Sequence, residues 1–356
     1  MEWQGSLHMI VLRILLWGSC FGKQLSLKDL DKKYGQCYGI NIRELSIERV
    51  HRLYSEERLN PAGLVECYLA RIKVLDPSLN SVLEINPDAM EEAKRLRWDD
   101  SCLPLYGIPI LVKDNFATLN TMSTASGSLA LLHQYPTSEA TVIKLLKRAG
   151  AVILGKSNMS EFAGLLSINA TRGWSTRGNQ TNNVYVLSRS PGGSSSGSAV
   201  AVSANLCMVA IGTETDGSII GPAALNGIVG MKAAVGAIPT DGIIPLAPSQ
   251  DAVGILARSV EDAFTVYACL DPKELPNIAS LRNRHEYFAK RWSPPPSKAR
   301  VGIVSNEDYL DEIPEASQAI RKFIKRANVN LQWNISMNIK HINQDDGNHP
   351  SNSSNI

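Results

Sequence analysis

Short apolar runs alternate with helical segments through the middle of the chain, and this alternation limits the fold more than any other feature of the sequence. Residues 107–112, GIPILV, form a continuous apolar run of the kind found in buried parallel strands. A helix is predicted over about 137–148, with Thr137 or Ser138 as its cap, and a second apolar run, AVILGK, begins at residue 151. A strand, a helix and another strand in this order predict a right-handed crossover and a parallel sheet with helices on its faces.

The alternation continues on both sides of this unit. Residues 196–206 predict a buried helix of small residues, and residues 208–213 predict the next strand. Upstream, Asn60 and Pro61 suit the N-cap and the first position of a helix, and one more strand is predicted from Arg300. We therefore expect an α/β fold in which a large mixed, mostly parallel sheet lies between helices, with an N-terminal helical segment.

The composition excludes some classes of partner. The 356 residues are 44% hydrophobic and 20% charged, which is ordinary for a soluble globular protein. The formal net charge is +2, and Lys/Arg blocks are limited to short runs such as residues 144–148, which argues against a nucleic-acid partner. No segment beyond the N-terminal stretch reaches transmembrane length, so we expect no membrane span.

The N-terminus allows two interpretations. Residues 9–17, MIVLRILLW, form an apolar stretch followed by small residues, as in a short signal peptide, but Arg13 interrupts it and no basic residue precedes it. We expect a cytoplasmic or organellar protein, or a secreted one if residues 1–22 act as a signal peptide. The glycosylation sequons would matter only in the second case, and they lie at Asn158, Asn169, Asn179, Asn334 and Asn352.

The six cysteines are widely and irregularly spaced, and no CxxC pair occurs. A structural zinc site is therefore not expected. Cys67 and Cys207 lie on apolar helical patterns and are predicted to be core residues. The other four allow a disulfide, which the sequence neither excludes nor pairs.

Three segments carry residues suited to serine chemistry. Lys113 closes the first apolar run; a lysine there is usually a surface residue, but burial would lower its pKa and leave an amine able to act as a base. Ser194 lies in the turn SPGGSSSGS, which alone could be a linker, although an apolar helix and strand follow it at once. Ser218 lies in a second turn, GTETDGSI. Neither turn has a histidine near it, so the pattern indicates a lysine base and a serine relay.

Simpler interpretations of the two turns remain open. The GxSxG pattern centred on Ser195 matches a nucleophile elbow only weakly, because the segment before Ser190 is a poor strand. The later histidines are His285, His341 and His349, and two of them lie in the tail. The turn before Ser218 could be an ordinary strand end. Alternatively, the main-chain N–H groups of Thr215, Asp216 and Gly217 could form a nest for an oxyanion.

Taken together, these segments resemble the amidase signature family. GIPILVKDN (107–115) and GKSNMSEFA (155–163) are similar to its first two conserved blocks, and residues 190–236 are similar to the signature itself. SQDAVGILARSVEDA, from Ser249, resembles the block that follows. The resemblance is dense from residue 107 to about 263 and extends more loosely to about residue 325.

The resemblance implies a Ser-cisSer-Lys triad. Ser218 falls on the nucleophile, Lys113 on the base, and Ser194 on the bridging serine, which a cis peptide bond joins to Gly193. It implies hydrolysis of a small-molecule carboxamide through an acyl-enzyme, with the oxyanion on the turn before Ser218 and with no metal or cofactor. Residues 78–93 are most similar to stand-alone amidases of the peptide-amidase and plant type. The amidase-like component of the glutamyl-tRNA amidotransferase, which needs partner subunits and an ammonia source, is also similar.

The resemblance also divides the chain. We expect a signal peptide or N-terminal tail over residues 1–25, an incomplete amidase signature domain over 26–330, and a polar, disordered tail over 331–356. Because family members are longer, we expect a C-terminally truncated or alternatively spliced product. An inactive isoform with only a binding role or no function, and a component of a glutamyl-tRNA amidotransferase, are the alternatives. The sequence indicates neither the substrate nor the oligomeric state.

Overall fold

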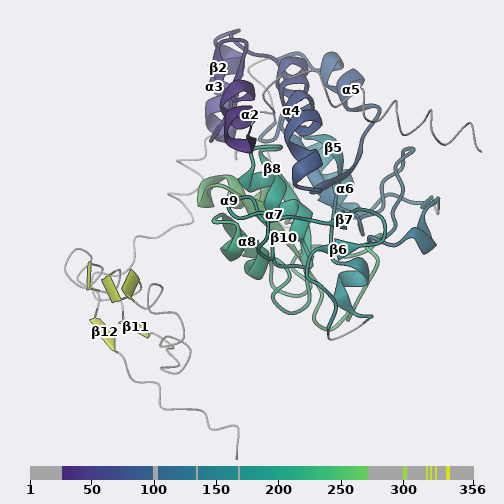
Figure 1. Cartoon of the computed structure of the whole chain (residues 1–356). Coiled ribbons are helices and arrows are strands. Elements are labelled where there is room, and N and C mark those ends of the chain that lie inside the picture. The colour runs from purple at the N-terminus through teal and green to yellow at the C-terminus, as the bar shows by residue number, and fades with distance from the viewer. Residues whose placement is uncertain are drawn as a thin grey trace, which may run out of the picture. The chain divides into compact units, whose positions relative to one another are not determined.

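The chain folds as two compact units, Met1–Arg284 and His285–Ile356, which are described separately. A computed structural model describes the following residues: 26–98, 103–133, 135–166, 169–271, 300–302, 318–319, 321–322, 325–326 and 334–336. The described residues do not include residues 1–25, with Cys20, nor do they include Cys102 or most of the predicted tail (Figure 1).

A six-stranded mixed sheet forms the centre of the first unit. Its strand order is β3-β5-β4-β8-β10-β9. The strands are β3 (Val82–Ile85), β4 (Pro109–Lys113), β5 (Val152–Ser157), β8 (Val209–Glu214), β9 (Val229–Lys232) and β10 (Ala252–Ala257). β4 pairs in parallel with β5 and β8, whereas β3 and β10 run antiparallel to their neighbours. Four strands, β5, β4, β8 and β9, thus share one direction, and the predicted mixed, mostly parallel sheet is confirmed.

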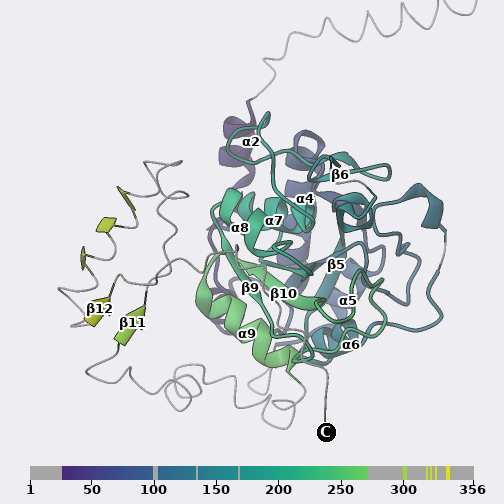
Figure 2. The ribbon, with the colours of Figure 1, turned by 90° about the horizontal axis from the view of Figure 1, so that it is seen from below.

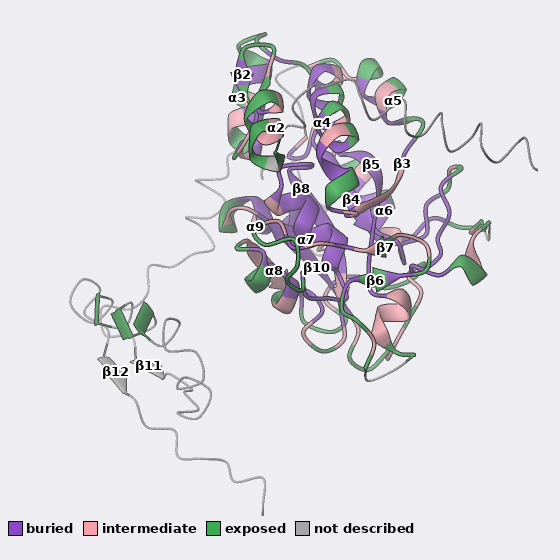
Figure 3. Ribbon diagram, viewed as in Figure 1, coloured by how far each residue is buried: buried purple, intermediate pink, exposed green. Residues whose placement is uncertain are grey.

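Helices cover both faces of this sheet, as predicted. Figure 2 shows α7 (Ser196–Ser203) and α8 (Ile220–Leu225) on one side of β9 and β10, and α6 (Thr141–Arg148) and α9 (Val260–Leu270) on the other. The small residues of α7 are buried from Ser196 to Val202, at the centre of the core (Figure 3). Gly197 shows why they are small: a Cβ there would lie 2.3 Å from the Ser81 carbonyl oxygen and 2.4 Å from the Asn158 nitrogen.

The helix boundaries follow local capping only in part. Asn60 caps α4 (Pro61–Leu75) as predicted, since its side chain accepts a 2.8 Å hydrogen bond from the Gly63 N–H. The predicted cap of α6 at Thr137 or Ser138 is wrong, because the helix begins at Thr141 with Ala140 as N-cap. The Ala140 N–H is bound instead to the Ala117 carbonyl, which keeps the preceding segment non-helical.

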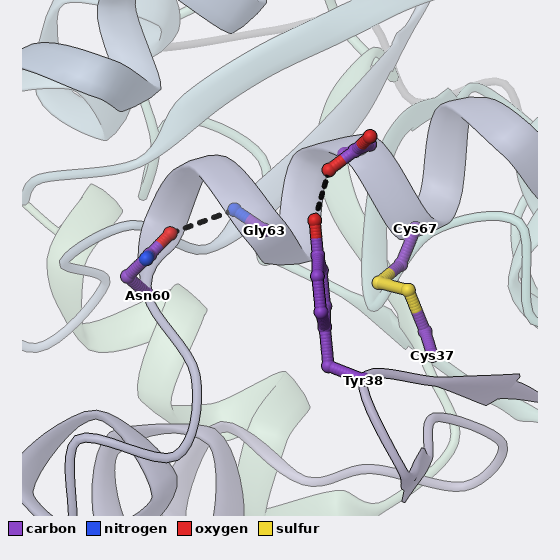
Figure 4. Close-up of a disulfide and its surroundings, with 6 residues drawn as sticks. Cys37, Tyr38, Asn60, Gly63 and Cys67 are labelled. Atoms are coloured by element: carbon purple, nitrogen blue, oxygen red, sulfur yellow. Dashed lines mark hydrogen bonds between the residues drawn. A yellow bond between two sulfur atoms is a disulfide. The ribbon is translucent and has the colours of Figure 1, made fainter.

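An N-terminal layer packs on α4 and is tied to it by a disulfide. Its elements are α2 (Leu27–Tyr34), β1 (Gln36–Cys37), β2 (Ile40–Asn41) and α3 (Ile47–Ser55). Cys67 on α4 is buried, as predicted, but it pairs with Cys37 of β1 (Figure 4). Its burial is confirmed, whereas the expectation that a disulfide would involve only the other four cysteines is wrong. An apolar helical pattern indicates burial, and a disulfide-bonded cysteine can be as buried as a free one. Cys207 is buried and unpaired, as predicted.

The remaining elements are short. They are η2 (Asp76–Ser78), α5 (Ala89–Arg95), η3 (Leu129–Leu131), η4 (Glu161–Gly164), β6 (Trp174–Ser175) and β7 (Asn179–Gln180). In the second unit, β11 (Arg300–Gly302) pairs in parallel with β12 (Asn334–Ser336), so the strand predicted from Arg300 is confirmed. Among the described helices, none has the length and apolarity to cross a membrane.

Candidate active site

Lys113 is the last residue of β4, and its side chain is fully buried. Its Nζ lies 2.7 Å from Ser194 Oγ, although the two residues are 81 positions apart. It also donates to Thr213 on the neighbouring strand β8, at 3.1 Å to the carbonyl oxygen and 2.9 Å to Oγ1. The parallel pairing of β4 with β8 therefore places the lysine against the Gly/Ser turn.

Burial controls the protonation of Lys113. Loss of solvation disfavours the ammonium and lowers the pKa of Lys113 to about 7, while the carboxylates of Asp251 and Glu214 act in the opposite direction. A large share of the side chain is then a neutral amine near pH 7. Such an amine donates two hydrogen bonds, here to the two oxygens of Thr213, and its lone pair is available to the Ser194 hydroxyl.

The Gly/Ser turn holds Ser194 at the start of α7. The Gly193–Ser194 peptide bond is cis, and Ser194 is fully buried. The next residue, Ser195, bonds through its Oγ to the Thr213 carbonyl at 3.1 Å, and its N–H donates to the Ser218 carbonyl at 3.1 Å. Ser195 thus joins the two serine turns. No hydrogen bond links the hydroxyls of Ser194 and Ser218 among the residues that the structure describes.

The turn from Thr215 to Gly217 presents free main-chain donors. Within the described residues, the N–H groups of Thr215, Asp216 and Gly217 donate to no acceptor. Glu214 fixes the far side of this turn, because its Oε2 accepts from the N–H groups of the two residues after Ser218, at 2.7 and 3.0 Å. Sequence reasoning missed Glu214. The only signal was an acidic residue, four positions before Ser218, at the end of an apolar strand.

A cavity of about 400 Å³ opens beside these groups. Ser194 and Thr215 line it, whereas Lys113 and Ser218 do not, so the cavity meets the site at Ser194 and at the turn that begins with Thr215. Much of its wall is apolar, and includes Phe162, Leu165, Ile243, Ile244, Pro245 and Leu246. Sequence reasoning missed this wall, because it is built from loops without any periodic pattern.

A second buried lysine provides a comparison. Lys156 at the end of β5 is also fully buried, and burial lowers its pKa to about 8. Its Nζ donates to the Phe116 carbonyl and, at 3.0 Å, to Thr124 Oγ1, and it forms no hydrogen bond with a serine of the described residues. Burial alone therefore does not separate the two lysines, whereas the contact with Ser194 is made by Lys113. The described residues hold no cluster of three or more metal-ligating His, Cys, Asp or Glu side chains.

The class that this fold and site define is that of the amidases, and the comparison with known families agrees. The family model described as Amidase matches residues 63–335, so the chain belongs to the amidase family.

Known proteins share this fold and much of this sequence. A probable amidase of Arabidopsis thaliana is 45% identical over 229 residues, which cover 63% of this chain and 45% of that protein. One subunit of the glutamyl-tRNA(Gln) amidotransferase of Lawsonia intracellularis is 41% identical over 68% of this chain and 50% of its own length. The native peptide amidase of Stenotrophomonas maltophilia superposes with a TM-score of 0.69 at 40% identity, covering 82% of this chain and 61% of that one. The chain spans about half the length of the two curated relatives, from Arabidopsis and Lawsonia.

Proposed function

We propose that this chain hydrolyses a carboxamide through Ser218, Ser194 and Lys113, with an acyl-enzyme intermediate. The observation that carries the proposal is the 2.7 Å contact between Ser194 Oγ and a buried Lys113 whose pKa is lowered to about 7. A serine hydroxyl becomes nucleophilic when a neighbouring base removes its proton, and a neutral lysine beside a serine supplies that base.

The proton moves in two linked steps. Lys113 accepts the proton of Ser194, which takes the proton of Ser218 as Ser218 Oγ attacks the amide carbonyl carbon. The carbonyl oxygen becomes an oxyanion, and the free N–H groups of Thr215, Asp216 and Gly217 stabilise it. When the C–N bond breaks, the relay returns a proton to the leaving amine. Water then attacks the ester of Ser218 by the same route and releases the acid.

Covalent labelling tests this proposal without knowledge of the substrate. A fluorophosphonate probe should label the purified chain, and labelling should disappear in Ser218→Ala, since only an activated serine reacts. Ser203→Ala is a suitable control, because Ser203 lies at the far end of α7 and bonds to the Asn226 carbonyl. A folded chain that takes up no label would contradict the enzyme hypothesis and favour an inactive binding form.

The similarity to the amidotransferase of Lawsonia intracellularis supports a second candidate function. A component of this kind would release ammonia from glutamine for its partner subunits. Glutaminase activity that arises only after those partners are added would favour this function, whereas release of ammonia from simple carboxamides by the chain alone would favour the stand-alone amidase.

A further inference from the structure

Asn115 is a polar residue of the cavity wall that the proposed mechanism does not use. It follows β4, two positions after Lys113, and lines the cavity together with Ser194. Its side chain is 4% exposed. A polar side chain this deeply buried is expected to have all its hydrogen-bonding groups paired.

The Asn115 side chain is paired on one side only. Its Nδ2 donates to Thr213 Oγ1 at 3.0 Å, and the same Oγ1 accepts from Lys113 Nζ at 2.9 Å. In this arrangement the NH₂ group of Asn115 faces Thr213, and both lone pairs of Thr213 Oγ1 accept hydrogen bonds. The other amide atom, Oδ1, is buried and has no hydrogen-bond partner within the described residues.

This unpaired acceptor belongs to the network that reaches Ser194. Three hydrogen bonds join Asn115 to Thr213, Thr213 to Lys113, and Lys113 to Ser194. In the proposed mechanism Ser194 protonates the leaving nitrogen, so the nitrogen of a bound carboxamide faces this network. An amide nitrogen carries N–H donors, whereas the leaving oxygen of an ester carries only lone pairs.

We propose that Asn115 Oδ1 accepts a hydrogen bond from the N–H of the scissile amide and makes the site select amides over esters of the same acyl group. The inference rests on the proposed function of this site. A site that holds a buried acceptor for a substrate N–H disfavours an analogue without that donor, because the acceptor then remains unpaired.

The kinetic test uses two substrates of the same shape, N-methylphenylacetamide and methyl phenylacetate, whose aryl groups suit the apolar wall. In Asn115→Leu, the ratio of kcat/KM for the amide to kcat/KM for the ester should fall about 10- to 100-fold. In Asn115→Asp, which keeps an acceptor oxygen, the ratio should stay near the original value. Loss of proton transfer through Lys113 and Ser194 would also slow the amide more than the ester, so the binding measurement below, which involves no proton transfer, separates the two causes.

Thr118→Val is the matched control. Thr118 Oγ1 is also a buried oxygen without a partner in the described part of the chain, but it does not line the cavity. Its loss should leave the ratio unchanged. If Asn115→Leu lowers both rates equally, Asn115 has only a positioning role through Thr213 and the inference is wrong.

A binding measurement separates this inference from the proposed function. Calorimetric titration of Ser218→Ala should show tighter binding of the amide than of the ester, and adding Asn115→Leu should abolish the difference. Such a preference, together with no turnover of either compound by the unmutated chain, would keep the role of Asn115 and reject the hydrolytic function. Equal affinities for the two ligands, or no binding of either, would overturn the inference.

Discussion

At the scale of single residues, the site depends on a lysine whose side chain solvent does not reach. Lys113 has three oxygen neighbours and two carboxylates that oppose the effect of burial on its pKa. The sequence could indicate Lys113, Ser194 and Ser218, because each lies in a distinctive turn or strand end. It could not indicate Asn115, because a single asparagine in a loop belongs to no sequence pattern. The residue stands out only in the structure, where its Oδ1 is buried without a hydrogen-bond partner in the described residues.

Removal of Lys113, the proposed base, should be costly. We expect Lys113→Ala to lower kcat/KM for a carboxamide near neutral pH by about 10²- to 10⁴-fold, the usual contribution of a general base. Lys156→Met serves as a comparison, since it removes an equally buried lysine that contacts no serine. Initial rates of ammonia release measure the effect, and an unchanged rate in Lys113→Ala would exclude it as the base.

The pH profile should report the pKa of Lys113. Protonation below about pH 7 removes the lone pair, so kcat/KM should rise with pH through that value. The Asp251 carboxylate raises the pKa of Lys113, so in Asp251→Asn the rise of kcat/KM with pH should occur at lower pH. The mutant keeps an oxygen for the N–H groups of Leu246 and Ala247. If kcat/KM of the mutant rises over the same pH range as that of the wild type, another group controls the rate.

At the scale of elements, strands were easier to predict than helix ends and sheet edges. The apolar runs that became β4, β5 and β8 are recognisable because a strand buried on both faces is continuously apolar. The start of α6 was not predictable, because a hydrogen bond from Ala140 to a distant carbonyl decided it. The antiparallel strands β3 and β10 pair with strands that are distant in the sequence, and no local sequence pattern predicts such pairing.

The close packing of α7 gives a stability prediction. Gly197→Ala should lower the free energy of unfolding by about 1–3 kcal/mol or more, because the new methyl group would clash with the backbone of residues 81 and 158. Gly221→Ala in α8 is the matched control, since a Cβ there meets nothing within 4 Å. It should be neutral or stabilising by up to about 1 kcal/mol. Urea unfolding of both variants measures the contrast, and equal midpoints would contradict the packing argument.

At the scale of the whole molecule, the Cys37–Cys67 disulfide joins the N-terminal layer to the rest of the first unit. It closes a loop with a sequence separation of 30, for which the loop-closure entropy corresponds to a stabilisation of about 3.6 kcal/mol. Reduction should therefore lower the urea midpoint of the wild-type chain. Cys37→Ser should show the lower midpoint without a reductant and should not respond to one. A midpoint that reduction leaves unchanged would mean that the hairpin of β1 and β2 is held by packing alone.

The pairing of β4 with β8 has a consequence for how such a chain can change over evolution. Residues Ile110 to Val112 stand opposite Val209 to Ile211 in a regular ladder, and this register brings the end of β4 to Thr213. The separation of Lys113 from the Gly/Ser turn is thus set by neighbouring strands and not by the length of the intervening chain. Insertions and deletions in the loops between residues 114 and 190 can reshape the cavity wall while Lys113 and Ser194 keep their spacing. New substrate preferences can therefore arise in this scaffold without rebuilding its chemistry.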